Sequence, residues 1–98
     1  MEIKDQADRA VEVSRSNEAK LILESKLFQE SMETLKKIYS EALLEKTGAN
    51  ESETREKLWI AYNVVGKVEQ HLHTIVETGK LASKQLEDFR KQQNNIKF

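Results

Sequence analysis

Three residue types that interrupt or cross-link folds are scarce in this chain of 98 residues: it has no proline, no cysteine and only three glycines. Without cysteine there is neither a disulfide nor a thiolate ligand for a metal. A sheet protein needs frequent turn residues and alternating apolar and polar positions, and the sequence shows neither. The composition therefore favours an all-α protein with long, solvent-exposed helices.

Long apolar runs and an excess of one charge are also missing. No run approaches the ~18 apolar residues of a membrane span, and the N-terminus is charged from Glu2 onward, unlike a secretory signal. Sixteen basic and 17 acidic residues give a formal net charge of -1, so the whole chain has no electrostatic bias towards nucleic acid or anionic lipid. We expect one small helical domain, residues 1–98, in a cytoplasm.

The clearest break in the helical pattern is the segment EKTGANESE, residues 45–53. Gly48 is suited to the position after a helix end, where a positive φ is common. Asn50 followed by Glu53 has the spacing of a capping box at a helix start. The sequence thus predicts a middle helix over 25–46 and a long C-terminal helix over 51–93. A connection this short favours an antiparallel hairpin.

The C-terminal helix carries a heptad pattern of apolar or small residues, with steps of three and four. Its positions are Leu58, Ala61, Val65, Val68, Leu72, Ile75, Gly79, Ala82, Leu86 and Phe89. The middle helix carries a looser stripe at Leu21, Phe28, Met32, Leu35, Tyr39 and Ala42, widened by Leu27, Ile38 and Leu43. These patterns predict that the two helices pack together.

Residues 1–24 are predicted to form a shorter N-terminal helix, with a break at Ser25, which is able to cap a new helix. The apolar set of this segment is weak: Ala7, Ala10, Val11 and Val13.

A hairpin alone cannot cover the apolar residues that the C-terminal helix carries beyond its heptad stripe. These are Trp59, Ile60, Tyr62, Val64, Val76 and Leu81. Because the N-terminal segment is poor in large apolar residues, we expect self-association into an oligomeric helical bundle.

The strongest candidates for an interface or core position are large apolar residues of the C-terminal helix, and the sequence does not divide them between the two roles. They are Leu58, Trp59, Tyr62, Val65, Leu72, Val76, Leu86 and Phe89. Gly79 falls within the heptad stripe, and a glycine costs ~1 kcal/mol in a helix relative to alanine. With Ala82 it predicts a notch for a bulky side chain from another helix, such as Phe28 or Trp59; the alternative is a local bend or break.

No residue set predicts catalysis or a cofactor. The serines have no paired histidine nearby and the glycines are isolated, so neither a nucleophile site nor a phosphate-binding loop is indicated. His73 lies four residues from Glu69 and Glu77, a spacing found in helical metal sites. With 17 acidic residues in the chain such a spacing is expected by chance, and a solvent-exposed or rim histidine is the better interpretation. We expect a non-enzymatic protein with no metal or cofactor.

The segment from Gly79 to the C-terminus holds five basic residues against two acidic ones. Lys80, Lys84, Arg90 and Lys91 are therefore candidate nucleic-acid contacts. Cations near the end of a helix also stabilise its dipole, which is the simpler explanation. A membrane-surface helix is not favoured, because the polar face is mixed in sign.

Three stretches give the sequence a family likeness: Arg55 to Trp59, Val68 to Leu72, and GKLA at Gly79 to Ala82. They lie within a region, roughly residues 20–88, that resembles small helical proteins encoded by tailed bacteriophages and prophages. The resemblance implies a phage origin but no activity.

A phage origin would leave three roles. The first is a virion or assembly component built as an oligomeric bundle. The second is a small subunit for DNA packaging that uses the basic C-terminal end. The third is an inhibitor or adaptor of a host protein. They differ in their expected DNA binding, oligomeric state and exposed apolar surface.

Overall fold

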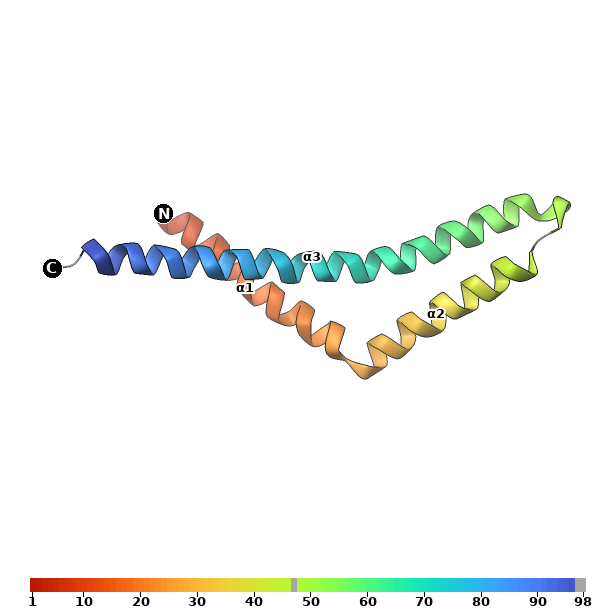
Figure 1. Ribbon diagram of the computed structural model, residues 1–98, viewed down its shortest axis with the longest axis horizontal. Helices are drawn as coiled ribbons and strands as arrows, with labels where there is room; N and C mark the ends of the chain where they lie inside the picture. Colours follow the sequence, from red (N-terminus) through yellow and green to blue (C-terminus); the bar gives the residue numbers. More distant parts are fainter. Residues whose placement is uncertain (47, 97–98) are drawn as a thin grey trace. The chain divides into compact units, whose positions relative to one another are not determined.

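A computed structural model describes residues 1–46 and 48–96 as three α-helices joined by short connections (Figure 1). They are α1 (Ile3–Glu24), α2 (Lys26–Glu45) and α3 (Ser52–Ile96), with a 3₁₀ turn, Ala49–Glu51, before α3. No strand occurs within the described residues, so the all-α prediction is confirmed. The last helix continues to Ile96, beyond the expected residue 93.

The break between α1 and α2 lies at Ser25, as predicted. Its backbone is extended, at φ -62° and ψ 123°, and its side chain accepts a hydrogen bond from the backbone N–H of Phe28. The Oγ to N distance is 3.3 Å. A serine in this position satisfies one of the N–H groups left without partners at a helix start. The local chemistry of one side chain therefore separates the two helices.

The connection before α3 differs from the sequence prediction at two residues. Gly48 has φ -67° and ψ 149° rather than a positive φ, and Asn50 lies inside the 3₁₀ turn rather than capping α3. The Gly48 carbonyl accepts a hydrogen bond from Glu51 N at 3.1 Å, so the turn is closed by this bond instead of a left-handed glycine. Thr47, within the predicted turn, lies outside the described residues.

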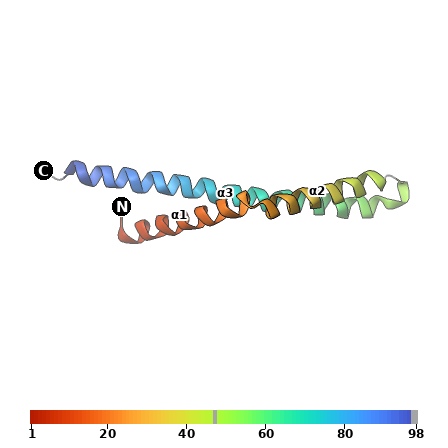
Figure 2. The same ribbon diagram turned by 90° about the horizontal axis from the view of Figure 1, so that it is seen from below.

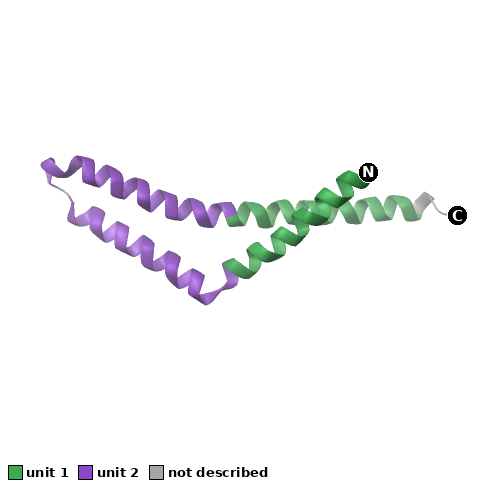
Figure 3. Ribbon diagram, turned by 180° about the vertical axis from the view of Figure 1, so that it is seen from behind, with its two compact units in different colours: residues 1–22, 72–98 green, residues 23–71 purple. Residues whose placement is uncertain are grey.

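The chain divides into two compact units, and α3 contributes to both (Figure 3). Unit 1 contains residues 1–22 and the part of α3 from Leu72 onward. Unit 2 contains residues 23–71, which include α2 and the first part of α3. Each unit is therefore a pair of helical segments that pack on each other.

In unit 2, α2 lies antiparallel beside the first part of α3 (Figures 1 and 2). Val65 is buried, and Leu58 and Ala61 are half-buried. The α2 residues that are half-buried in the same way are Phe28, Met32, Leu35, Tyr39 and Ala42. A cross-helix ion pair joins Lys36 Nζ to Glu69 Oε2 at 3.0 Å. Most residues of the two predicted stripes thus form this hairpin, but Leu27, Ile38 and Val68 are exposed. Leu21, also assigned to the stripe of the middle helix, is exposed and lies in α1.

In unit 1, α1 crosses the later part of α3 (Figures 1 and 3). The residues buried at the crossing are small or branched: Ser16, Ala19, Val76, Gly79 and Ala82. The weak apolar set noted in the sequence of α1 contributes little here, because Ala7, Ala10 and Val11 are exposed and only Val13 is half-buried. Small side chains let the helices approach closely and bring little hydrophobic area with them.

The notch at Gly79 is occupied by a different group from the one predicted. α3 continues through it without a break, so close packing is confirmed over a bend. The occupant, however, is α1 and not a bulky side chain: a Cβ added at Gly79 would overlap the Cβ and Oγ of Ser16 and stand 3.0 Å from the carbonyl oxygen of Glu12. The notch accommodates the helix itself, which explains why a helix-destabilising residue is placed there.

The buried core is small. Within the described residues, the buried apolar side chains are Ala19, Val65, Val76 and Ala82. Two of these four are alanines, and the other large apolar side chains of the described residues are half-buried or exposed.

Candidate interaction surfaces

The structure separates the eight residues predicted as interface or core by their exposure. Val65 and Val76 are buried. Leu58, Leu72, Leu86 and Phe89 are half-buried along the heptad stripe. Trp59 and Tyr62 are exposed, and Trp59 leaves 61% of its surface in solvent. Of the eight, Trp59 therefore offers the largest exposed aromatic surface to another molecule, and Tyr62 offers a smaller one, with 38% of its surface in solvent.

Trp59 and Tyr62 lie on one flank of the hairpin in unit 2, here named the aromatic flank. Residues three or four apart share a side of a helix, so Trp59, Tyr62 and Gly66 follow one line along α3. A groove of about 300 Å³ runs beside this line. Its lining residues are Lys36, Tyr62, Asn63, Gly66, Lys67 and Gln70. The groove combines an aromatic ring with amide and ammonium groups. This mixture of groups is suited to binding the surface of another protein.

A second exposed surface lies on the opposite flank, here named the aliphatic face. Ile60, Val64 and Val68 follow one another at intervals of four residues. At about 100° per residue, Val64 and Val68 lie about 120–180° around α3 from Trp59 and Tyr62, and Ile60 lies about 100° from Trp59 and about 160° from Tyr62. On α2, Lys36 lines the aromatic groove, and Ile38 is about 200° further round the helix. Ile38 therefore lies on the same side as the three α3 residues.

The four residues of the aliphatic face are all large and all exposed. Ile38, Ile60, Val64 and Val68 leave 53%, 50%, 52% and 43% of their surfaces in solvent. The antiparallel hairpin, with ion pairs Lys46–Glu51 at its turn and Lys36–Glu69 further along, puts Ile38 beside the segment of α3 that carries the other three. Single exposed apolar residues are ordinary on monomers, whereas a contiguous group marks an interaction site.

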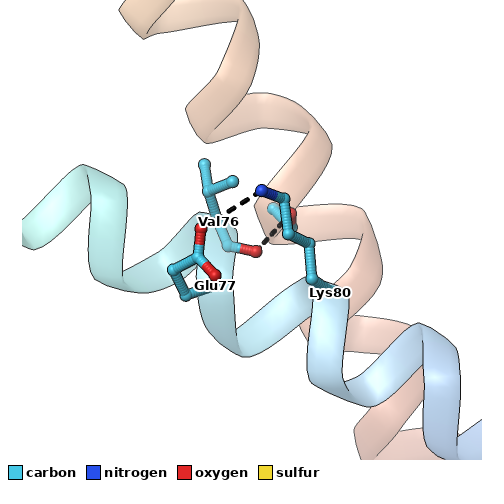
Figure 4. Close-up of polar contacts among 4 residues, drawn as sticks. Val76, Glu77 and Lys80 are labelled. Atoms are coloured by element: carbon cyan, nitrogen blue, oxygen red, sulfur yellow. Dashed lines mark hydrogen bonds and ion pairs between the residues drawn. The ribbon is translucent and has the colours of Figure 1, made fainter.

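The candidate nucleic-acid contacts do not form an unneutralised cluster. Lys80 Nζ lies 3.2 Å from Glu77 Oε1, and Figure 4 shows this ion pair on α3 beside the Val76 carbonyl. Lys91 Nζ lies 3.4 Å from Glu87 Oε1. Lys84 is exposed and lies on the same side of α3 as Lys80 and Lys91, at spacings of four and seven residues. Arg90 is exposed on another side. Lys97, in the same basic segment, lies outside the described residues.

A groove of about 430 Å³ lies between α1 and α3 in unit 1. It is lined by Met1, Asp5, Arg9, Gln85, Asp88, Phe89 and Gln92. Arg9 is held by Glu12, with 3.0 Å between Nη1 and Oε1. His71 and His73 are exposed, and within the described residues no three His, Asp or Glu side chains are grouped to hold a metal. Among the same residues, no helix has the length and apolarity needed to cross a membrane.

The chain matches no protein-family model, no curated protein and no solved structure.

Any functional conclusion must therefore come from the surfaces themselves. The aliphatic face was only partly visible in the sequence, because Ile38 and Val68 fit the stripes that pack within the hairpin and only Ile60 and Val64 stood outside them. The spacing of Ile60, Val64 and Val68, four residues apart, is the signal for the face, since it departs from the alternating steps of the heptad pattern.

Proposed function

We propose that this protein is a non-enzymatic helical protein that associates with itself and with other proteins, as a structural or assembly component of a bacteriophage. The observation that carries the proposal is the exposure of large apolar side chains on two flanks of the unit 2 hairpin. Trp59 on one flank and Val64 on the other each leave more than half of their surface in solvent. The phage context rests on the family likeness of residues 20–88.

The small core supports association with a partner. Folded domains are stable by only ~5–15 kcal/mol, because burial barely exceeds the loss of chain entropy. Among the residues that the structure describes, four apolar side chains are buried, and because two of them are alanines they bring little burial to that balance. A chain that covers more of its surface in an oligomer gains the missing stabilisation, and its stability then depends on protein concentration.

The experiment is size-exclusion chromatography with light scattering, run alone and with double-stranded DNA. We expect a mass that is a fixed multiple of 11.4 kDa and no change on adding DNA. A fixed oligomer that binds DNA with a steep salt dependence would instead support a DNA-packaging subunit. A monomer at all concentrations would overturn the proposed self-association.

The third role, an inhibitor or adaptor of another protein, depends on the aromatic flank. Trp59 and the groove beside Tyr62 remain available if the chain self-associates through the opposite flank. Aromatic side chains with nearby polar groups are enriched where proteins bind each other. The same light-scattering sample, supplemented with Trp59→Ala, tests this role: adaptor function requires the substitution to spare the oligomer and abolish capture of a protein partner.

A further inference from the structure

We infer that the aliphatic face seats a second copy of this chain, with α2 of each copy packed antiparallel against α3 of the other. The inference rests on the proposed self-association and assigns it to one surface: Ile38, Ile60, Val64 and Val68. The resulting dimer is a four-helix arrangement built from two hairpins. It leaves the aromatic flank of each copy free.

The register inside one hairpin supplies the geometry. Ion pairs join Lys46 to Glu51 at the turn and Lys36 to Glu69 further along the hairpin, so Ile38 lies beside the segment of α3 that carries Ile60, Val64 and Val68. A two-fold axis parallel to the helices repeats this antiparallel arrangement between the copies. Ile38 of each copy then packs against the line of Ile60, Val64 and Val68 of the other, and the contact occurs twice, as an isologous interface requires.

The charges beside the face are complementary to a second copy in this register. Glu41 and Glu45 on α2 are exposed and four residues apart, a spacing at which like charges repel. On α3, Lys57 is exposed in line with Ile60 and Val64, and its Nζ lies 3.3 Å from Glu53 Oε1. The antiparallel arrangement brings Lys57 of the second copy to the same level as Glu45. Each copy therefore brings a cation towards the other's unfavourable pair of carboxylates.

The composition of the face suits such an interface. A standard interface buries about 800 Å² on each partner, and the four residues of the face leave 43% to 53% of their surfaces in solvent. The face itself holds no charged side chain at its centre, as interface cores do. A formal net charge of -1 gives little electrostatic repulsion between copies.

The first test is Val64→Asp, with Val11→Asp as its matched control. Both valines are about equally exposed, at 52% and 58%, but Val11 lies on α1 in unit 1. We expect Val64→Asp to halve the light-scattering mass of the dimer while far-UV circular dichroism still shows helix. Val11→Asp should keep the wild-type mass. A wild-type mass for Val64→Asp would overturn the inference, whereas a monomeric wild-type protein would overturn the proposed function instead.

The second test uses the absence of native cysteine to place the copies. Ile38→Cys and Val64→Cys proteins are mixed and oxidised mildly, and each is also oxidised alone, with Val11→Cys as control. We expect a disulfide-linked pair chiefly in the mixture, because Ile38 faces Val64 of the second copy. Efficient linkage of Val64→Cys alone, without linkage in the mixture beyond it, would overturn the α2-to-α3 arrangement.

Discussion

Ser16 Oγ donates a hydrogen bond to the carbonyl oxygen of Val76, at 3.2 Å and across sixty positions of sequence. Ser16 is 3% exposed, so the bond is shielded from water. Three residues beyond Val76, Gly79 receives the side chain of Ser16 and the backbone near Glu12. The crossing of α1 and α3 is thus held by close approach of small residues and one buried hydrogen bond.

Gly79→Ala should destabilise the protein, although alanine is the better helix former by ~1 kcal/mol. The added Cβ would overlap Ser16, and overpacking of this kind typically costs ~1–3 kcal/mol. Urea denaturation followed by circular dichroism, at one fixed protein concentration, measures the change.

Gly66→Ala is the matched control for that substitution. Gly66 is also within α3, and a Cβ added there meets nothing within 4 Å. Helix propensity then decides the sign, and we expect stabilisation by ~0.5–1 kcal/mol. Equal stabilisation by both substitutions would contradict the close approach of α1 to Gly79.

Ser16→Ala should cost ~0.5–1.5 kcal/mol, the usual contribution of one hydrogen bond. The side chain shortens without a clash, so the loss of the bond to Val76 is the main effect. Ser16→Val should cost more, because it adds methyl groups where Gly79 leaves no room. If both variants unfold at the wild-type urea concentration, the crossing contributes nothing to stability.

Ser25→Ala removes the side-chain acceptor that caps α2 at the N–H of Phe28. We expect a loss of ~1 kcal/mol and reduced helix content, because an unsatisfied N–H is left at the helix start. Ser25→Asp retains an acceptor and is the control, with stability close to wild type. Thermal unfolding followed by circular dichroism distinguishes the two, and identical curves for both would show that the cap is unimportant.

Trp59 is the single tryptophan of the chain and reports the state of the aromatic flank. Since this flank lies opposite the aliphatic face, Trp59 should remain accessible to acrylamide in the self-associated protein. Trp59→Ala should cost well below the ~3–5 kcal/mol of a buried tryptophan. Protection from acrylamide that disappears on dilution would instead identify the aromatic flank as the interface between copies.

Much of the helical pattern could be predicted because it depends on large apolar residues at regular spacing. The heptad stripe from Leu58 to Phe89 lies inward at most positions, and the hairpin follows from it. Ser25 carried a recognisable cap signal. The backbone conformation of Gly48 could not be predicted. Glycine is common both in a left-handed conformation after a helix and in an extended conformation before a 3₁₀ turn, so the residue type does not distinguish them.

The packing of α1 was missed because it is made by residues without hydrophobic signal. Ser16 and Ala19 are three residues apart, and so are Gly79 and Ala82; all four are buried at the crossing. Pairs of small residues with the same spacing on two helices indicate that the helices approach closely. A search for apolar periodicity misses such pairs, because serine, glycine and alanine have weak hydropathy. The sequence identified Trp59 and Tyr62 as apolar residues outside or beside the heptad stripe, but not whether they are buried in the hairpin or exposed. That depends on how much of the circumference of α3 is covered by α2.

The central claim is that another copy of the chain covers part of the apolar surface left in water. Sedimentation equilibrium of the wild-type protein over a wide concentration range tests it most directly. The account predicts a mass of twice 11.4 kDa, or a fixed higher multiple, that falls towards the monomer on dilution. A well-folded species of 11.4 kDa at every concentration, including the highest, would contradict it.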